Sequence, residues 1–444
     1  MRRNIPLCVF AFFAGSWGLT PGAMALPSYA RQTGLPCSGC HTTPPELNNS
    51  GRLFKLLAFS DRSENSITAP SDKRRSGLNM LESLPLSAFL ETSTTGTKAP
   101  QAATQNWNFE FPQDISLFLA GAWATHLGSF LQVTYNVQDD HFSIDNTDIR
   151  YANKRQLAGK EWDYGVTLNN NPTVEDLWNS TPGWGFPFIA SDSAPTPTAA
   201  PVINGLLAED VAGLGAYTMW DQHVYFAGTL YRSDHVGDTQ PTTGQCCSNN
   251  IRGVAPYWRL ALQQTVRTAN LEVGVYGIHM KSTPGNITGP ENSYTDFGPD
   301  IQYDRTIGKD VLSVRGTYIR ENSALVASVA DDAANPGPHH LNASDANVEY
   351  HFGNRLSGTF GWFLTNGTTD STLYPQSAVT GSANGNPRST GIMANVSYWP
   401  IQNLDLAVQY TDYTRFNGAA TNYDGAGRDA SDNNTVYLLA RFLF

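Results

Sequence analysis

Polar and apolar residues alternate one by one through most of this chain, in segments separated by turn-forming residues. In the segment Leu404–Tyr410, every second residue is apolar, and Asp405 and Gln409 lie between them. A period of two places the apolar side chains on one face of a β-strand and the polar ones on the other. Charged residues on one face and large apolar residues on the other are typical of a barrel wall with lipid outside and water inside.

Sixteen segments of this kind follow one another from about residue 85 to the end of the chain. We expect strands at 85–95, 113–124, 129–137, 144–152, 161–170, 211–220, 223–232, 255–266, 270–280, 294–305, 310–321, 343–352, 355–365, 390–399, 403–415 and 435–444.

Short and long connections between these segments alternate. The short turns are expected near His126, Asp221, Thr268, Ile307, Gly353 and Pro400. The long loops are expected at 171–210, 233–254, 281–293, 322–342, 366–389 and 416–434. Bacterial outer-membrane barrels sort their connections in this way, with short periplasmic turns and long outer loops, whereas a soluble β-sandwich has no reason to do so. The sequence therefore predicts a mostly β fold, with an antiparallel outer-membrane barrel of about sixteen strands at 81–444.

A second, sharper motif precedes the first strand: Cys37-Ser38-Gly39-Cys40-His41. Two thiols on one short turn can form thioethers with the two vinyl groups of a c-type haem, and the following histidine can ligate the iron. A thioredoxin-like redox pair and half of a zinc site are the competing interpretations. The first needs a strand-helix-strand context and the second needs further ligands at matching spacing, and neither is evident nearby. We therefore expect one covalent haem c on Cys37 and Cys40, with His41 as an axial ligand.

The surroundings of the motif are those of a very small cytochrome domain, expected at 26–80. Thr42-Thr43 before two prolines predicts a helix start. Arg52 or Lys55 could pair with a haem propionate, although both could equally be solvated charges. Met80 is the tentative sixth ligand, with an ordinary apolar residue as the alternative. His126 and His141 become candidates only if the barrel wall reaches the haem.

The remaining sequence features bear on location and partners. Arg2 and Arg3 precede an apolar stretch that ends in the small-x-small pattern Ala23-Met24-Ala25, so we expect 1–25 to be a cleaved signal peptide, with an uncleaved anchor as the alternative. The net charge of −11 argues against nucleic acid as a partner. Cys246 and Cys247 are adjacent in a long loop, and we assign them no role.

These residues together resemble a known family. Ala30-Arg31-Gln32-Thr33-Gly34, the haem motif, Pro45, Leu47, Gly51-Arg52 and Phe54-Lys55 look like the fused monohaem cytochrome–porins of bacterial outer membranes, whose best-known members are iron oxidases. Ser50 departs from the family pattern, which has an aromatic residue there. The resemblance implies electron transfer across the outer membrane, from extracellular Fe(II) or another outer redox partner to a periplasmic cytochrome or other soluble carrier.

Three functions are compatible with this sequence. The first is an inward electron conduit, with the cytochrome segment as a plug in the lumen. The second is a diffusion porin that the haem segment plugs or gates, and the third is outward electron transfer to an external acceptor. The aromatic loop from Asn169 to Phe188, which carries Trp178 and Trp184, is the segment expected to fold inward. Acidic residues in the expected outer loops could concentrate a cation or could simply be solvated, namely Asp139, Asp140, Asp192, Asp234, Asp238, Asp331, Asp332, Asp424 and Asp429.

Overall fold

The computed structural model describes residues 26–42, 46–61, 66–68, 79–81, 84–101, 104–137, 140–180, 189–204, 207, 211–234, 249–284 and 288–444. The expected signal peptide, Cys246 and Cys247 therefore lie outside the described residues.

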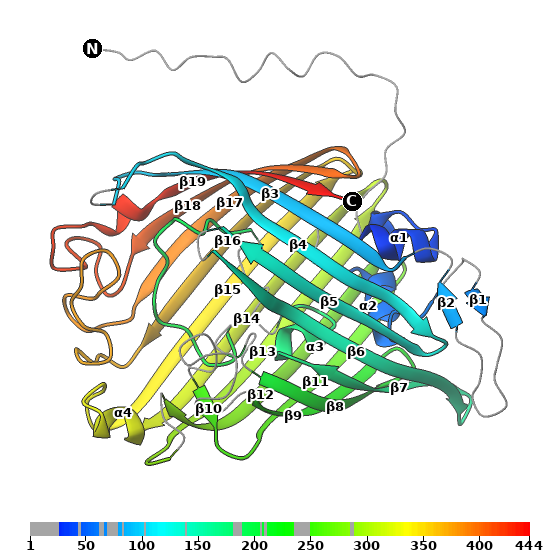
Figure 1. The fold of residues 1–444 in the computed structure, drawn as a ribbon, viewed down its shortest axis with the longest axis horizontal. Coiled ribbons are helices and arrows are strands. Elements are labelled where there is room, and N and C mark those ends of the chain that lie inside the picture. The colour runs from blue at the N-terminus through cyan, green and yellow to red at the C-terminus, as the bar shows by residue number, and fades with distance from the viewer. Residues whose placement is uncertain are drawn as a thin grey trace, which may run out of the picture.

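Sixteen of the described strands form one closed antiparallel ring, which confirms the predicted barrel (Figure 1). Each strand pairs with the next along the chain, β9 pairs with β11, and the ring closes between β19 and β3. The ring consists of β3 (Leu86–Thr97), β4 (Asn108–Ala124), β5 (Leu127–Asn136), β6 (His141–Leu157), β7 (Lys160–Asn169), β8 (Val211–Trp220), β9 (Val224–Ser233), β11 (Ala255–Val266), β12 (Ala269–Pro284), β13 (Asn292–Ile307), β14 (Asp310–Leu325), β15 (Pro338–Phe352), β16 (Leu356–Gly367), β17 (Ser389–Ile401), β18 (Leu404–Arg415) and β19 (Thr435–Leu443). The short β10 (Asn249–Ile251) only extends the sheet at the end of β12.

The two ends of the barrel differ as the sequence predicted. At one end the strands are joined by turns such as 221–223 and 308–309, whereas at the other end the loops include 170–210 and 416–434. The long-loop end also holds α4 (Val326–Ala330) and the 3₁₀-helix η2 (Ala430–Asn433), on the left in Figure 1. We call the two ends the short-turn end and the long-loop end.

The barrel wall is polar inside and apolar outside. On β11, Trp258, Leu260 and Leu262 are 37%, 41% and 58% exposed, whereas Arg259 and Gln263 between them are buried. The same arrangement, with apolar side chains outside and polar ones inside, recurs around the ring. Leu214 and Phe109, for example, are about 70% exposed on the outer surface. Water would penalise such a continuous apolar surface, whereas the hydrocarbon of a bilayer accommodates it. The wall is therefore built to face lipid.

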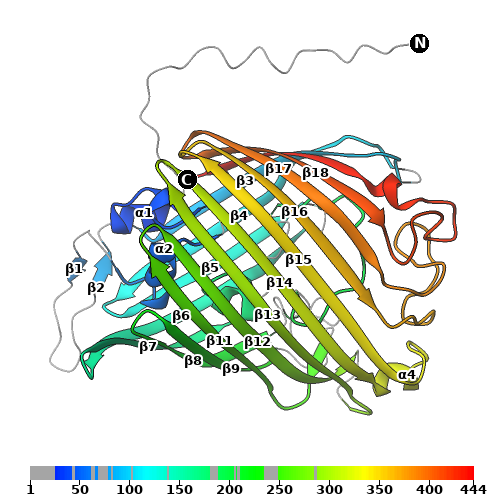
Figure 2. The same ribbon diagram turned by 180° about the vertical axis from the view of Figure 1, so that it is seen from behind.

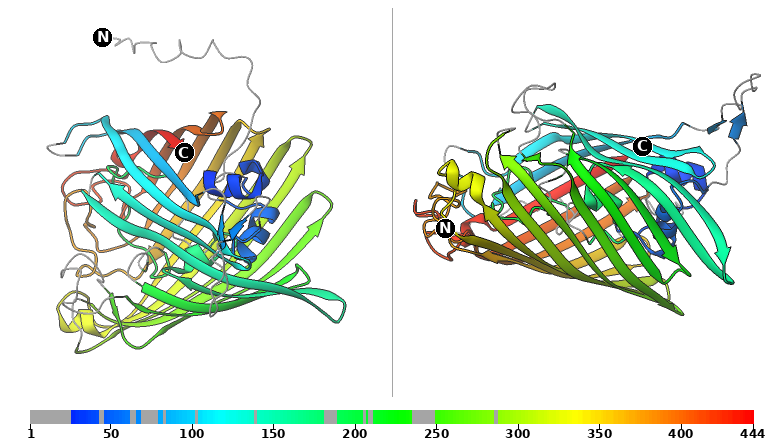
Figure 3. Two further views of the ribbon diagram at one scale, coloured as in Figure 1. Left: turned by 45° about the vertical axis from the view of Figure 1, so that its right-hand side comes forward. Right: turned by 90° about the horizontal axis from the view of Figure 1, so that it is seen from below.

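The N-terminal segment sits in the mouth of the barrel at the short-turn end (Figures 1 and 2). It consists of α1 (Pro27–Thr33), a 3₁₀ turn η1 (Cys37–Gly39) and α2 (Asn49–Leu56). A hairpin of β1 (Ser66–Thr68) and β2 (Asn79–Leu81) follows and lies beyond the rim (Figure 3). We call residues 26–61 the plug.

The helix start predicted at Thr42 was wrong: α2 begins at Asn49. Asn48 accepts a hydrogen bond from the backbone N–H of Gly51 and so caps the helix, whereas Thr42 belongs to the tighter loop that follows the cysteines. None of the helices in the described part of the chain is long and apolar enough to cross a membrane.

Candidate haem site and the closed lumen

The two cysteines of the motif lie on one tight turn. The backbone N–H groups of Cys40 and His41 both donate to the carbonyl of Cys37, at 3.0 and 2.9 Å, which closes the 3₁₀ turn η1. Both side chains are buried, and the two thiols are not joined in a disulfide. The turn thus presents two thiols and a following histidine in the compact arrangement that attachment of a c-type haem requires.

The ring of His41 is held by the loop that follows it. Its Nδ1 lies 3.2 Å from the carbonyl oxygen of Glu46, which also accepts from the N–H of Thr42. An antiparallel bridge between His41 and Leu47 closes this loop. A hydrogen bond from one ring nitrogen to a backbone carbonyl is the usual way in which a protein orients a metal-ligating histidine.

A cavity of about 460 Å³ lies directly beside His41, between the plug and the wall of the barrel. Its size falls within the range of about 300–1,000 Å³ that is common for ligand sites. Trp399, Val311 and Leu356 give it an apolar side. Four cationic side chains line the cavity, and one carboxylate, that of Asp304, lies among them. The cations are Arg52, Arg267, Lys309 and Arg355. The cations could pair with the two carboxylates of a haem and the apolar side could cover part of its ring, while most of the other lining residues are polar. Cys37 adjoins the cavity through Trp399, against which it packs.

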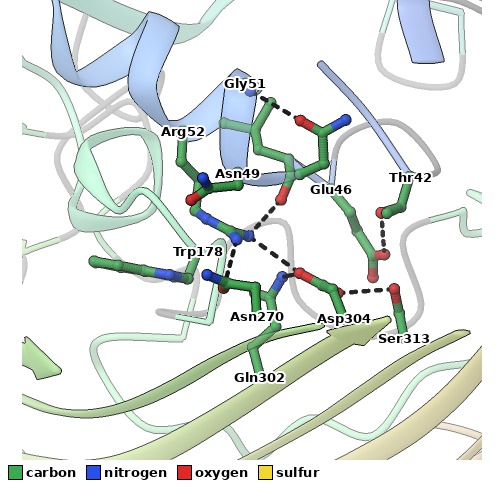
Figure 4. Close-up of polar contacts among 12 residues, drawn as sticks. Thr42, Glu46, Asn49, Gly51, Arg52, Trp178, Asn270, Gln302, Asp304 and Ser313 are labelled. Atoms are coloured by element: carbon green, nitrogen blue, oxygen red, sulfur yellow. Dashed lines mark hydrogen bonds and ion pairs between the residues drawn. The ribbon is translucent and has the colours of Figure 1, made fainter. Parts of the chain in front are cut away.

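Helix α2 packs tightly against the motif and carries one wall of the cavity. A Cβ at Gly51 would lie 2.1 Å from the carbonyl oxygen of Cys40, so only glycine permits this approach. Arg52, the next residue, reaches the barrel wall and donates to Asn270 at 2.8 Å and to Asp304 at 3.3 Å (Figure 4). Burial lowers the pKa of Arg52, and the carboxylate of Asp304 opposes that shift. Arg52 therefore both docks the plug and borders the cavity.

Lys55 points away from the cavity, so only one of the two predicted propionate partners borders it. Its ammonium donates to the carbonyl of Asp176 at 2.7 Å, in the interior of the barrel. Burial and then the nearby guanidinium of Arg150 together lower the pKa of Lys55 to about 7. This lysine joins the plug to the loop that fills the lumen.

The shifted pKa of Lys55 predicts a pH dependence of plug docking. The unfolded chain has the ordinary lysine value near 10.5, so between about pH 7 and 10.5 it binds more protons than the folded form, and stability rises with pH in that window. Below pH 7 the cost of burying the charge is fully present, with an upper bound of about 5 kcal/mol. Replacing Lys55 by Met should flatten this rise in the unfolding temperature, whereas the exposed control Lys98→Met should leave it intact. An equally steep rise in the Lys55→Met variant would contradict the assignment.

The loop between β7 and β8 folds into the lumen rather than outward. Its first part forms α3 (Pro172–Glu175) against β6 and β7, followed by Leu177 and Trp178, which are 0% and 2% exposed. These side chains pack with Leu56 of the plug and with Tyr217 and Tyr225 of the wall. Trp184, Phe186 and Phe188, which the sequence also placed in this loop, lie outside the described residues.

Two fully buried arginines of the wall hold this loop. Arg150 pairs with Asp148 and donates to the carbonyl of Glu175 at 2.6 Å. Arg259 lies 3.2 Å from the carboxylate of Asp176 and stacks over Trp178, with 5.0 Å to the ring centroid. Glu272 and Asp300 of the wall also pair with Arg259, at 3.0 and 2.7 Å.

The later part of the same loop crosses to other parts of the wall. Ile189 packs on Ala407, Tyr437 and Leu439 and accepts a hydrogen bond at its carbonyl from Gln409. Val202 and Ile203 donate their N–H groups to Glu321 and Asp296 and pack against a cluster of tyrosines. Since these anchors lie on β18, β13 and β14, the loop spans the interior.

The other predicted site residues are spread over the molecule. Met80 lies on β2, paired with Ile67, and its side chain is not among those described, so its role as sixth ligand stays a prediction. His126 lies in the turn after β4 and is not among the described residues that line the cavity. His141 begins β6 at the long-loop end, far along the barrel from His41.

Sequence reasoning missed one histidine that borders the cavity, His351. It lies on β15, directly before a short turn, at an inward position of the alternating pattern. The sequence alone shows that His351 has the inward position of the alternation and lies next to a short turn. These two facts point to a site only after the structure places the Cys37–His41 motif at the same end of the barrel.

No protein-family model matches the sequence, and no curated protein matches it. The fold is similar to those of solved outer-membrane channels. The channel DcaP of Acinetobacter baumannii is 12% identical with a TM-score of 0.46, and the alignment covers 85% of this chain and 100% of that one. Salmonella typhi OmpF, solved with daunomycin, is 11% identical with a TM-score of 0.45 over 81% and 97% of the two chains. The anion-selective porin from Comamonas acidovorans is 11% identical with a TM-score of 0.44 over 81% and 98%.

Proposed function

We propose that this chain is an outer-membrane protein whose plug carries one covalent c-type haem and which transfers electrons between the outer face and the periplasm. The observation that carries the proposal is the placement of His41, which borders a cavity at the seam of plug and wall and follows two thiols on one turn. A haem bound there would supply a one-electron redox centre.

Different residues of the chain would hold different parts of the haem. Cys37 and Cys40 provide the two points of attachment, and His41, oriented by the carbonyl of Glu46, provides the proximal nitrogen. The cationic side chains around the cavity would pair with the propionates, and Trp399 and Val311 would cover part of the apolar ring. Many of the remaining lining residues are polar, so a haem held here would be partly solvated and would have a lower potential than a fully buried haem.

The plug and the inward loop occupy the interior of the barrel, which favours the transfer of electrons over the diffusion of solutes. Leu56 of α2 packs into one buried cluster with Leu177 and Trp178 of the inward loop, and the later part of that loop is anchored across the interior on β13, β14 and β18. Water-soluble molecules would have to displace this cluster, whereas an electron does not. We assign the short-turn end to the periplasm, where a soluble cytochrome or similar carrier would meet the haem, and the long-loop end to the outside.

The donor we propose is Fe(II), with electrons moving inward. Ferrous iron gives an insoluble product when it is oxidised near neutral pH, so oxidation outside the cell keeps that product out of the periplasm. The net charge of −11 is compatible with a cationic donor. Outward electron transfer to an external acceptor would use the same haem and the same barrel. It differs from Fe(II) oxidation only in the direction in which the electron moves.

A diffusion channel is the second candidate, favoured by the barrel itself. Sixteen strands leave an aqueous lumen when nothing fills it, and the inner wall is lined by polar side chains. In that case the plug would close or gate the pore. Solute conductance through the holo protein separates the two functions.

The conduit is tested in liposomes that contain oxidised holo protein in one orientation. Ferrous iron added on the long-loop side should reduce the protein. The rate should fall severalfold in Trp178→Ala, because that ring anchors the loop that fills the lumen. The exposed control Asp331→Asn should change the rate only slightly, since salt screens exposed charges over about 8–10 Å.

The outcomes separate the parts of the proposal. Reduction by other outer-side reductants but not by ferrous iron would remove iron as the donor and leave the conduit. Reduction only from the short-turn side would contradict the conduit and favour the channel.

A further inference from the structure

A second histidine lines the cavity and comes from the barrel wall. His351 is 8% exposed, lies at the end of β15, and lines the same cavity as His41. The two residues come from different parts of the fold, one from the plug and the other from the barrel wall. Among the described residues that line the cavity, these two are the histidines, and the lining includes neither a methionine nor a cysteine.

One buried network connects the two histidines. The carbonyl of Glu46 binds Nδ1 of His41, and the carboxylate of Glu46 pairs with Arg315 of β14. Arg315 also lies 3.8 Å from Glu349, and the other oxygen of Glu349 lies 3.2 Å from Nε2 of His351. The three linking side chains are at most 9% exposed. Glu46 and Glu349, which contact the two rings, are thus linked through Arg315.

The pairing of His351 with Glu349 has a chemical consequence. A ligating histidine commonly binds a carboxylate through its second ring nitrogen, which fixes the ring and raises its basicity as a ligand. Glu349 sits two residues before His351 on the same inward face of β15, so strand geometry alone keeps the two together. A buried histidine with this partner, which lines the same cavity as the proposed ligand His41, has the features of a ligand.

We propose that His351 provides the second axial nitrogen to the iron of the haem attached at Cys37 and Cys40. The inference rests on the proposed haem attachment, but on neither the identity of the donor nor the direction of transfer. It replaces Met80 with a residue of the barrel wall. The haem would then be bonded to both the plug and the wall, so that its coordination requires the plug to be docked. Two imidazoles would also give a lower potential than imidazole with a thioether.

The test uses purified, detergent-extracted holo protein and its electron paramagnetic resonance and visible spectra. The oxidised wild type should be low-spin with a bis-imidazole signature. In His351→Ala the major species should become high-spin, and added imidazole should restore the low-spin form. His351→Met should stay low-spin with a higher midpoint potential than the wild type.

Two controls make the result specific. His126→Ala removes a histidine at the same end of the barrel that does not border the cavity, and it should leave the spectrum unchanged. A haem-stained band that shifts on heating verifies in every variant that haem is attached and the barrel is folded.

Each remaining outcome has one meaning. Unchanged spin state and potential in His351→Ala, with haem attached, would overturn the inference and leave the proposed function in place. A high-spin form in Met80→Ala instead would assign the ligand to Met80. A wild type without haem would refute the proposed function itself. Failure of outer-side reduction while His351→Ala turns high-spin would refute the conduit alone.

Discussion

Replacing both Cys37 and Cys40 by alanine should abolish covalent haem completely, because the two thioethers are the only covalent links that this proposal contains. Protein produced in a host that matures c-type cytochromes should show one haem-stained band on a denaturing gel, and the double variant should show none. Either single variant should keep at most one thioether and stain weakly. The barrel should still fold, because the plug has independent anchors such as Arg52 with Asp304 and Tyr217 with Leu56.

The matched control is the pair Cys246→Ala and Cys247→Ala, which removes the other two thiols that follow the expected signal peptide. This control should stain like the wild type. An unstained wild type at the correct mass, from a host that matures another cytochrome in parallel, would reject haem attachment. The redox-pair and zinc interpretations of the motif would then have to be tested by thiol titration and metal analysis.

Replacing Arg259 by Met should convert a closed barrel into a conducting one. The variant leaves Asp176, Glu272 and Asp300 buried without their common cation, and loss of one partner from a buried ion pair typically costs about 3–5 kcal/mol. Because Asp176 belongs to the inward loop and the other two carboxylates to the wall, the repulsion acts directly on the docking of that loop. Release of the loop would open the polar lumen to ions.

The measurement is single-channel conductance of the full-length holo protein in planar bilayers. The wild type should conduct at a small fraction of the level that a sixteen-stranded open pore reaches, and Arg259→Met should rise toward that level. Arg305→Met, an exposed arginine of β13, is the matched control and should stay closed. A wild type that already conducts like an open porin would favour the diffusion channel over the electron conduit.

The barrel was predictable because its determinants are local. A strand that faces lipid on one side and water on the other must alternate, as Trp258 to Gln263 do, and this pattern is visible without any knowledge of neighbours. Strand number followed from counting such segments, and the sorting of turns and loops followed from their lengths. The motif from Cys37 to His41 is equally local, because two thioethers and an axial ligand require three residues within one turn, and haem attachment there stays a prediction.

The helix of the plug was less predictable, and the reason is again physical. The sequence offered Thr42 and two prolines as a start, but the structure uses Asn48 as the cap. The intervening loop is shaped by contacts that have no local signature, including the approach of Gly51 to the carbonyl of Cys40. Propensity alone could not weigh these contacts against the apparent start.

The alternating pattern and the haem motif required no tertiary information, since each is satisfied within one strand or one turn. The path of the loop through the lumen, the network from Glu46 through Arg315 to Glu349, and the arrival of His351 beside the cavity were decided only by the folded barrel. They join residues as distant in sequence as Glu46 and Arg315. Their buried charges are tolerated only because closure of the wall brings the partners together out of water. A local pattern can specify the face on which a residue lies, but ring closure determines which residues meet across it.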